Sequence, residues 1–185
     1  MGEHFQSIVD RDATSEEAEQ LASLVVDVLV KRGIIEADQS SCILGFDPGY
    51  PPGPSVKDVV TAPADSLREL WTNGLEVVTE RNVFDARQAS SDFVCDACHL
   101  RFSYEDVSPG WSDAIDEWYK GEGVGLFACP RCKEAKPITD WTFDPPWGFG
   151  NLGFTFWNWP PLRESFVEEI TALLGHRTVL VAGKL

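Results

Sequence analysis

The sequence predicts an α+β fold, in which a small sheet with flanking helices is interrupted by an inserted module. Three observations lead to this expectation. An apolar pattern with helical spacing begins at Leu21, a strand–helix–strand pattern fills the C-terminal third, and two CxxC pairs lie between them. The chain has 185 residues, of which 43% are apolar, so it can bury one ordinary core. We expect residues 1–92 and 141–185 to form an α+β main domain, and residues 93–140 to form the insertion.

The first helix is marked at both of its ends. Thr14 and Glu17 have the spacing of a capping box, in which each side chain bonds the other's backbone N–H. Gly33 suits the position after the last helical residue, where the backbone turns left-handed. The residues between recur on one helical face: Leu21, Leu24, Val25, Val28 and Leu29.

The segment that follows is rich in proline and glycine. Residues 45–54 read GFDPGYPPGP, which is either a Pro-rich docking ligand or an ordered connection. We favour the connection. Residues 56–71 then allow a second short helix, and residues 75–79 form a strand that enters the cysteine region.

The C-terminal third predicts a β-α-β unit. Residues 153–159 are aromatic and β-favouring, and Pro160-Pro161 can open a helix because proline is tolerated in the first turn. Phe166 and Ile170 continue one apolar face of this helix, and Gly175 ends it. Residues 177–182 form the last strand.

Four cysteines predict a metal site. Cys95 and Cys98 form one CxxC pair, Cys129 and Cys132 form a second, and 30 residues separate the pairs. The N-terminal residues are acidic and lack the apolar stretch of a secretory signal, so we expect a cytoplasmic protein with reduced thiols. Four thiolates suit one tetrahedral Zn²⁺, and a complete ligand shell indicates a structural ion. Cys42 lies far from both pairs and is expected to be buried.

The two pairs resemble the knuckles of zinc ribbons, and the second, Cys129-Pro130-Arg131-Cys132, has a form typical of those modules. The resemblance covers residues 93–140 only, and it implies the four cysteines as zinc ligands. The 30 intervening residues exceed the usual ribbon length, and residues 112–120 suit a short helix between the knuckles.

Other uses of these cysteines are weaker. Iron also binds four thiolates and stays an alternative metal. Cys95 to His99 matches the CxxCH pattern of haem attachment, but that chemistry belongs to exported proteins. A redox role suits a lone CxxC better than two pairs that can share one metal.

A glycine-rich stretch between the cysteine region and the last third has no supporting context. Residues 148–153 match GxGxxG, but two prolines precede them and a strand follows them. A dinucleotide site needs a strand before this motif and a helix after it. We therefore expect these glycines to serve a tight turn or bulge.

Residues 141–159 are unusually rich in aromatic rings. We expect most of these rings to fill the core, and Trp147, beside two prolines, to be exposed. Exposed aromatic residues commonly anchor protein partners. The candidate partner-binding residues are Trp147, Phe149, Trp157 and Trp159.

The net charge of −15 disfavours partners with negative charge, namely nucleic acids and anionic membranes. The leading hypothesis is a non-enzymatic, zinc-binding protein of the adaptor or immunity type. Its acidic surface would bind a basic protein partner. One alternative is an enzyme with a pocket near residues 141–159. A second alternative, a nucleic-acid-binding ribbon, needs a basic face from Arg101, Lys120, Arg131, Lys133 and Lys136.

Overall fold

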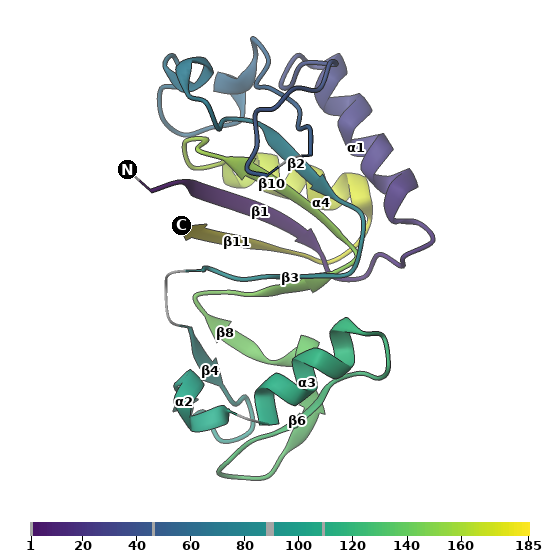
Figure 1. The fold of residues 1–185 in the computed structure, drawn as a ribbon, viewed down its shortest axis with the longest axis vertical. Helices are drawn as coiled ribbons and strands as arrows, with labels where there is room; N and C mark the ends of the chain where they lie inside the picture. Colours follow the sequence, from purple (N-terminus) through teal and green to yellow (C-terminus); the bar gives the residue numbers. More distant parts are fainter. Residues whose placement is uncertain (1, 46, 88–90, 109) are drawn as a thin grey trace.

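The structure is a computed structural model that describes residues 2–45, 47–87, 91–108 and 110–185, and it confirms the α+β fold class. A four-stranded antiparallel sheet, in the order β11-β1-β10-β2, organises the main part of the molecule (Figure 1). Its strands are β1 (His4–Asp10), β2 (Leu75–Val78), β10 (Leu152–Trp157) and β11 (Thr178–Lys184). None of the described helices has the length and apolar character needed to cross a bilayer.

Strand β1 lies inside this sheet and was not foreseen from the sequence. It pairs with β10 on one side and with β11 on the other. Ile8 and Val9 are both fully buried, on opposite faces of the sheet. A strand covered on both faces loses the alternation of apolar and polar residues that marks a half-buried strand.

Helices α1 (Ala18–Lys31) and α4 (Glu164–Leu174) cover one face of the sheet and share a core with Ile8, Phe154 and Phe156. Helix α1 ends as predicted, with Gly33 at a φ of 68°. The Gly33 and Ile34 amides donate to carbonyls of the last turn, which is a Schellman arrangement. The Thr14–Glu17 hydrogen bonds form in the turn just before the helix.

The predicted strand–helix–strand unit is present as β10-α4-β11 and has a split arrangement. Strands β10 and β11 both run antiparallel to β1, so they are parallel to each other with β1 between them. Gly175 ends α4 with a φ of 71°.

The connection between α1 and β2 is ordered, and the second helix expected there is absent. Residues 56–71 form only two 3₁₀ turns, η1 (Val56–Asp58) and η2 (Leu67–Glu69). Pro63 lies between the turns, where it interrupts helical hydrogen bonding. Within residues 47–54, Tyr50 pairs with Leu75 and Gly53 donates to Ile34, so this stretch is packed against the fold. Residue 46 lies outside the described residues.

A second core lies at the other end of the molecule (Figure 1). Helix α3 confirms the helix predicted between the cysteine pairs, and Trp111 on this helix is 1% exposed. The elements are β4 (Asp92–Val94), β5 (Arg101–Phe102), α2 (Tyr104–Val107), α3 (Gly110–Tyr119), β6 (Leu126–Ala128), β7 (Ala135–Pro137), η3 (Ile138–Asp140) and β8 (Thr142–Asp144). The proposed boundary at residue 140 stays a prediction, and the rings of Trp141, Phe143 and Phe149 pack into this second core.

A two-stranded ribbon, β3 (Asn82–Phe84) paired with β9 (Gly148–Gly150), joins the two parts. Two arginines also bridge them. Arg81 donates to the carbonyl of Trp118 at 2.6 Å and lies over its ring, and Arg11 donates to the carbonyl of Thr139 at 2.6 Å. Both contacts attach the small module to the main sheet.

Most rings of residues 141–159 are core, as predicted, but Trp147 is half-buried and its predicted exposure is wrong. Its ring stacks on Phe143 with centroids 5.0 Å apart, and its indole N–H donates to Ser91 Oγ at 2.7 Å. Phe149, Trp157 and Trp159 are buried. The four candidate partner-binding rings therefore offer a partner little exposed surface.

The glycines at residues 148–153 permit close packing of strands. They lie in β9 and at the start of β10, with no helix after them, so the context of a dinucleotide site is absent. A Cβ on Gly150 would overlap the carbonyl oxygen of Asp10, and a Cβ on Gly153 would overlap the ring of Phe84. The ribbon can lie against β1 only because side chains are missing at these positions.

We predict that Gly150→Ala lowers the free energy of unfolding by about 1–3 kcal/mol, because the backbone carbonyl of Asp10 cannot yield to the added methyl group. Urea denaturation checks the value. Gly110→Ala is the control, since its Cβ would meet only Phe127 at an ordinary 3.6 Å. Equal effects of the two substitutions would contradict this packing role.

A buried carboxylate fastens the end of β1 to the start of β11. Asp10 is 0% exposed and accepts hydrogen bonds from the backbone N–H groups of Asp12 and Ala13. His176 Nδ1 lies 2.9 Å from the Asp10 carboxylate, and its Nε2 lies 3.5 Å from Glu17. The hydrogen bond with Asp10 raises the pKa of His176 above its ordinary value of 6.5.

We predict that the stabilising effect of His176 depends on pH. Because folding raises its pKa, its contribution to the free energy of unfolding is complete below about pH 6.5 and is lost as pH rises through the folded value. The difference between wild type and His176→Gln should therefore shrink as the pH rises above about 6.5. Urea denaturation at several pH values below and above this point measures it, and a constant difference would disprove the linkage.

Candidate metal centre

The four predicted cysteines converge in the small module. All four sulfurs lie within 4.8 Å of one another. The Sγ atoms of Cys95 and Cys132 are 3.7 Å apart, and those of Cys98 and Cys129 are 3.8 Å apart. Four sulfurs bound at about 2.3 Å around a tetrahedral ion lie about 3.8 Å from each other. The cluster therefore has the dimensions of a four-thiolate metal site.

Two hairpin turns of the same construction present these sulfurs. In the first, Cys95 receives a hydrogen bond from the amide of His99 and donates its own to Leu100. In the second, Cys129 receives one from Lys133 and donates to Glu134. His99 and Lys133 hold matching left-handed positions, with φ of 58° and 66°. This repeated turn fits a zinc-ribbon-like module, and it makes His99 a turn residue.

The thiols cannot all ionise without a cation beside them. Burial opposes ionisation of Cys129, but the backbone N–H groups of Cys132 and Arg131 point at its sulfur and lower its pKa to about 7. The Glu134 amide favours ionisation of Cys132, but burial and the other three sulfurs raise its pKa to about 12. A negative charge on one sulfur thus opposes the ionisation of the next thiol. A divalent cation between the sulfurs would relieve this repulsion.

The first cysteine of each pair is anchored in the aromatic core. Cys95 and Cys129 are 1% and 0% exposed and pack in the cluster around Trp111, while Cys98 is half-buried and Cys132 exposed. An ion pair between Lys136 and Asp96 joins the two hairpins outside the sulfurs. Cys42, as predicted, is buried elsewhere, beside Phe5 and Trp157.

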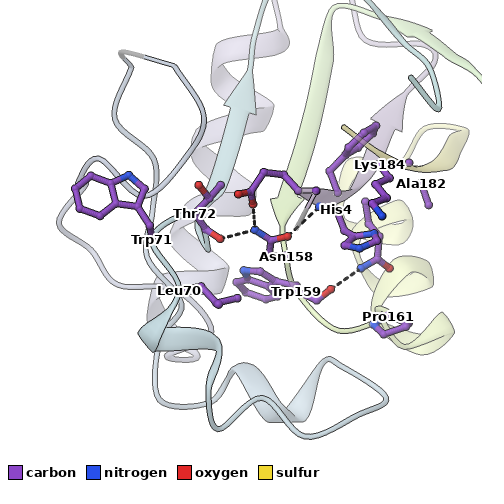
Figure 2. Close-up of a pocket in the computed structure, with 14 residues that line it drawn as sticks. His4, Leu70, Trp71, Thr72, Asn158, Trp159, Pro161, Ala182 and Lys184 are labelled. Carbon is purple, nitrogen blue, oxygen red and sulfur yellow. Dashed lines mark hydrogen bonds between the residues drawn. The ribbon is translucent and has the colours of Figure 1, made fainter. Parts of the chain in front are cut away.

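A different surface feature escaped the sequence analysis. Trp71 is 84% exposed and Leu70 is 45% exposed, at the edge of a 770 Å³ hollow beside the N-terminal end of β1. Figure 2 shows Leu70 beside Trp159, and the Trp71 ring pointing away from the fold. Asn158 fixes this rim through hydrogen bonds with the carbonyl of Thr72 and the amide of His4. Leu70 and Trp71 follow the 3₁₀ turn η2, and a turn this short has no periodic sequence pattern that would distinguish buried positions from exposed ones.

Comparisons with protein-family models, with curated proteins and with solved structures found no match to this chain. The conclusion about the site therefore rests on the chain's own geometry. The chain is an α+β protein with a four-cysteine cluster that can hold a metal ion.

Proposed function

We propose that the chain is a non-enzymatic protein-interaction protein, of the adaptor or immunity type, whose small module is held by one structural zinc ion. The partner binds at Leu70, Trp71 and the adjoining hollow. The exposure of Trp71 carries the interaction part of this proposal. The convergence of the four sulfurs carries the metal part.

Zinc is favoured by the donor set. Four thiolates complete a tetrahedral shell and leave no open position for a water or substrate, as in structural zinc sites. Iron accepts the same ligands, so the metal analysis below has to quantify both elements.

An exposed tryptophan beside an apolar hollow is the usual form of an interaction hot spot. Trp71 offers a large rigid ring at the rim, and Leu70, Trp159 and Pro161 line the hollow next to it. Leu70 and Trp71 also line a second, smaller hollow, together with Glu69. A partner that binds the ring can therefore contact both hollows.

The charge of the chain supports a basic partner. With a net charge of −15, the protein attracts basic surfaces over a distance of roughly one Debye length and repels acidic ones. The two hollows beside Trp71 contribute Glu3 and Glu69 at the site itself, although Lys184 and Arg68 lie there too. The net negative charge therefore attracts a basic partner mainly through the surface as a whole, and the Trp71 ring is the local contact that anchors it.

The enzyme alternative has less support. Asp10 and His176 are the described pair that most resembles an oriented acid–base dyad. Asp10 also accepts hydrogen bonds from the amides of Asp12 and Ala13, and Nε2 of His176 lies 3.5 Å from Glu17. These contacts favour a structural role for the pair at the junction of β1 and β11.

The nucleic-acid alternative has less support, because three of its five basic residues are paired with carboxylates. Arg101 pairs with Asp92 and Asp144, and Lys120 pairs with Asp116. Lys136 pairs with Asp96, and Lys133 donates to a backbone carbonyl. Basic residues neutralised by neighbouring carboxylates contribute little to phosphate binding.

We predict that protein purified without added metal contains about one equivalent of zinc and no iron, measured by elemental analysis. Cys129→Ser should lose the metal and open residues 91–147 to limited proteolysis, because the metal's binding energy stabilises this module. Cys42→Ala is the control and should retain the zinc. Less than half an equivalent in wild type, or unchanged digestion of Cys129→Ser, would refute the structural metal.

We predict that Trp71→Ala weakens binding of the natural protein partner at least about thirtyfold, the effect of losing a hot-spot residue worth about 2 kcal/mol. The experiment isolates partners by affinity capture from native cells and then titrates the purified partner by calorimetry. Tyr119→Ala, which removes an aromatic residue 52% exposed on the small module, should bind as wild type does. Equal affinity of all three proteins would place the interface elsewhere.

A further inference from the structure

The sheet face opposite the helices carries a polar row across three strands. Ser7 on β1 lies opposite Thr155 on β10, and Thr155 lies opposite Glu76 on β2. Residues directly opposite each other in antiparallel strands point to the same face. The adjacent row is aromatic, because Phe5 lies opposite Trp157 with ring centroids 5.6 Å apart.

A small cavity of 130 Å³ opens above this row. The polar row forms its base, Phe5 and Trp157 line one side, and Phe84 of the ribbon lines another. The rest of the lining comprises Leu44, Val78, Asn82, Val83, Asp85 and Arg87. The cavity is thus built from the main sheet, the ribbon and the loop before β2.

The base of the cavity has unused hydrogen-bonding capacity. The hydroxyls of Ser7 and Thr155 are 2.8 Å apart, and these residues are 1% and 5% exposed. One hydroxyl donates to the other, so several of their oxygen lone pairs and one hydroxyl hydrogen have no partner among the described residues. Each hydroxyl oxygen already has one partner, and its remaining lone pairs can accept a donor from a bound group.

The charge at the base is negative. Glu76 Oε2 accepts a hydrogen bond from the Trp157 indole at 2.8 Å, and Oε1 has no hydrogen-bond partner within the described ranges. Glu76 forms no ion pair with any described cation, whereas Arg87 at the rim faces Asp85 at 3.8 Å. The charged side chains that line the cavity are thus the carboxylates of Glu76 and Asp85 and the guanidinium of Arg87, so the lining carries a net negative charge.

We propose that this cavity binds a primary alkylammonium group. An ammonium has three donors and no acceptor, which matches the Glu76 carboxylate and the lone pairs of the two hydroxyls. The attached carbon chain would lie against Phe5, Trp157 and Leu44, and aromatic rings also attract cations. The group can belong to a free amine or to a lysine side chain of a protein.

The test follows the Trp157 indole N–H by NMR on ¹⁵N-labelled protein, because this group donates to Glu76 and reports on its carboxylate. The probes are n-butylammonium and its neutral isostere n-butanol. A saturable shift is expected with n-butylammonium, and binding of n-butanol should be at least about tenfold weaker, since hydrogen bonds to charged groups are the stronger ones. Equal affinities, or no saturation with n-butylammonium, would overturn the proposal.

Variants locate the binding group. Glu76→Gln keeps the shape and a carbonyl oxygen, and it should weaken n-butylammonium binding at least about tenfold. Glu80→Gln removes an exposed carboxylate just beyond the same strand and should bind as wild type does. An unchanged affinity in Glu76→Gln, or an equal loss in Glu80→Gln, would show that general acidity attracts the cation and would overturn the site.

Two further measurements complete the test. The first distinguishes a free amine from a protein lysine as the source of the ammonium group, and the second tests this cavity separately from the proposed interaction at Trp71. Nα-acetyl-lysine methylamide should bind at least as tightly as n-butylammonium if a protein lysine is the natural occupant, and more weakly if a free amine is. Trp71→Ala should leave n-butylammonium binding unchanged, because Trp71 does not line this cavity. A loss of binding in Trp71→Ala would contradict the assignment of the cavity.

Discussion

The pairing of β1 with two strands from the other end of the chain is the constraint on which the fold depends. Residues 4–10 form hydrogen bonds with β10 on one side and with β11 on the other. The four-stranded sheet can therefore form only when β1 has met both of these distant strands. Bringing together segments this distant in sequence lowers the chain's conformational entropy before the contacts between them contribute any stabilisation. Burial of the apolar side chains of β1 on both faces of the sheet, together with the hydrogen bonds of the buried Asp10, offsets that cost.

The small module meets a different constraint, because its strands are only two or three residues long. Such short strands bury little surface, and an aromatic cluster around Trp111 supplies most of the core. This packing leaves the indole N–H groups of Trp111 and Trp141 without acceptors in the described structure. A core with such costs benefits from a metal, which contributes its binding energy directly to folding.

The sequence predicted what local chemistry determines. Gly33 and Gly175 mark the helix ends, and the two CxxC pairs mark the four-cysteine cluster, because each of these signals lies within a few residues of the chain. It could not predict β1, whose two buried faces remove the alternating pattern. Trp147 and Trp71 show the same limit: tertiary contacts with Phe143 and Ser91 half-bury Trp147, whereas Trp71 is 84% exposed.

The ribbon of β3 and β9 links the two halves of the molecule energetically as well as spatially. Phe84 on β3 packs over Gly153 and forms a wall of the small cavity, and β3 is paired with β9. Strand β9 follows Trp147, whose ring belongs to the second core. The wall of the cavity above Ser7, Thr155 and Glu76 is therefore built on a ribbon whose other strand continues from the second core. Since no side chain is present at Gly148, Gly150 and Gly153, this ribbon packs directly on the sheet, with the close contact typical of a protein interior.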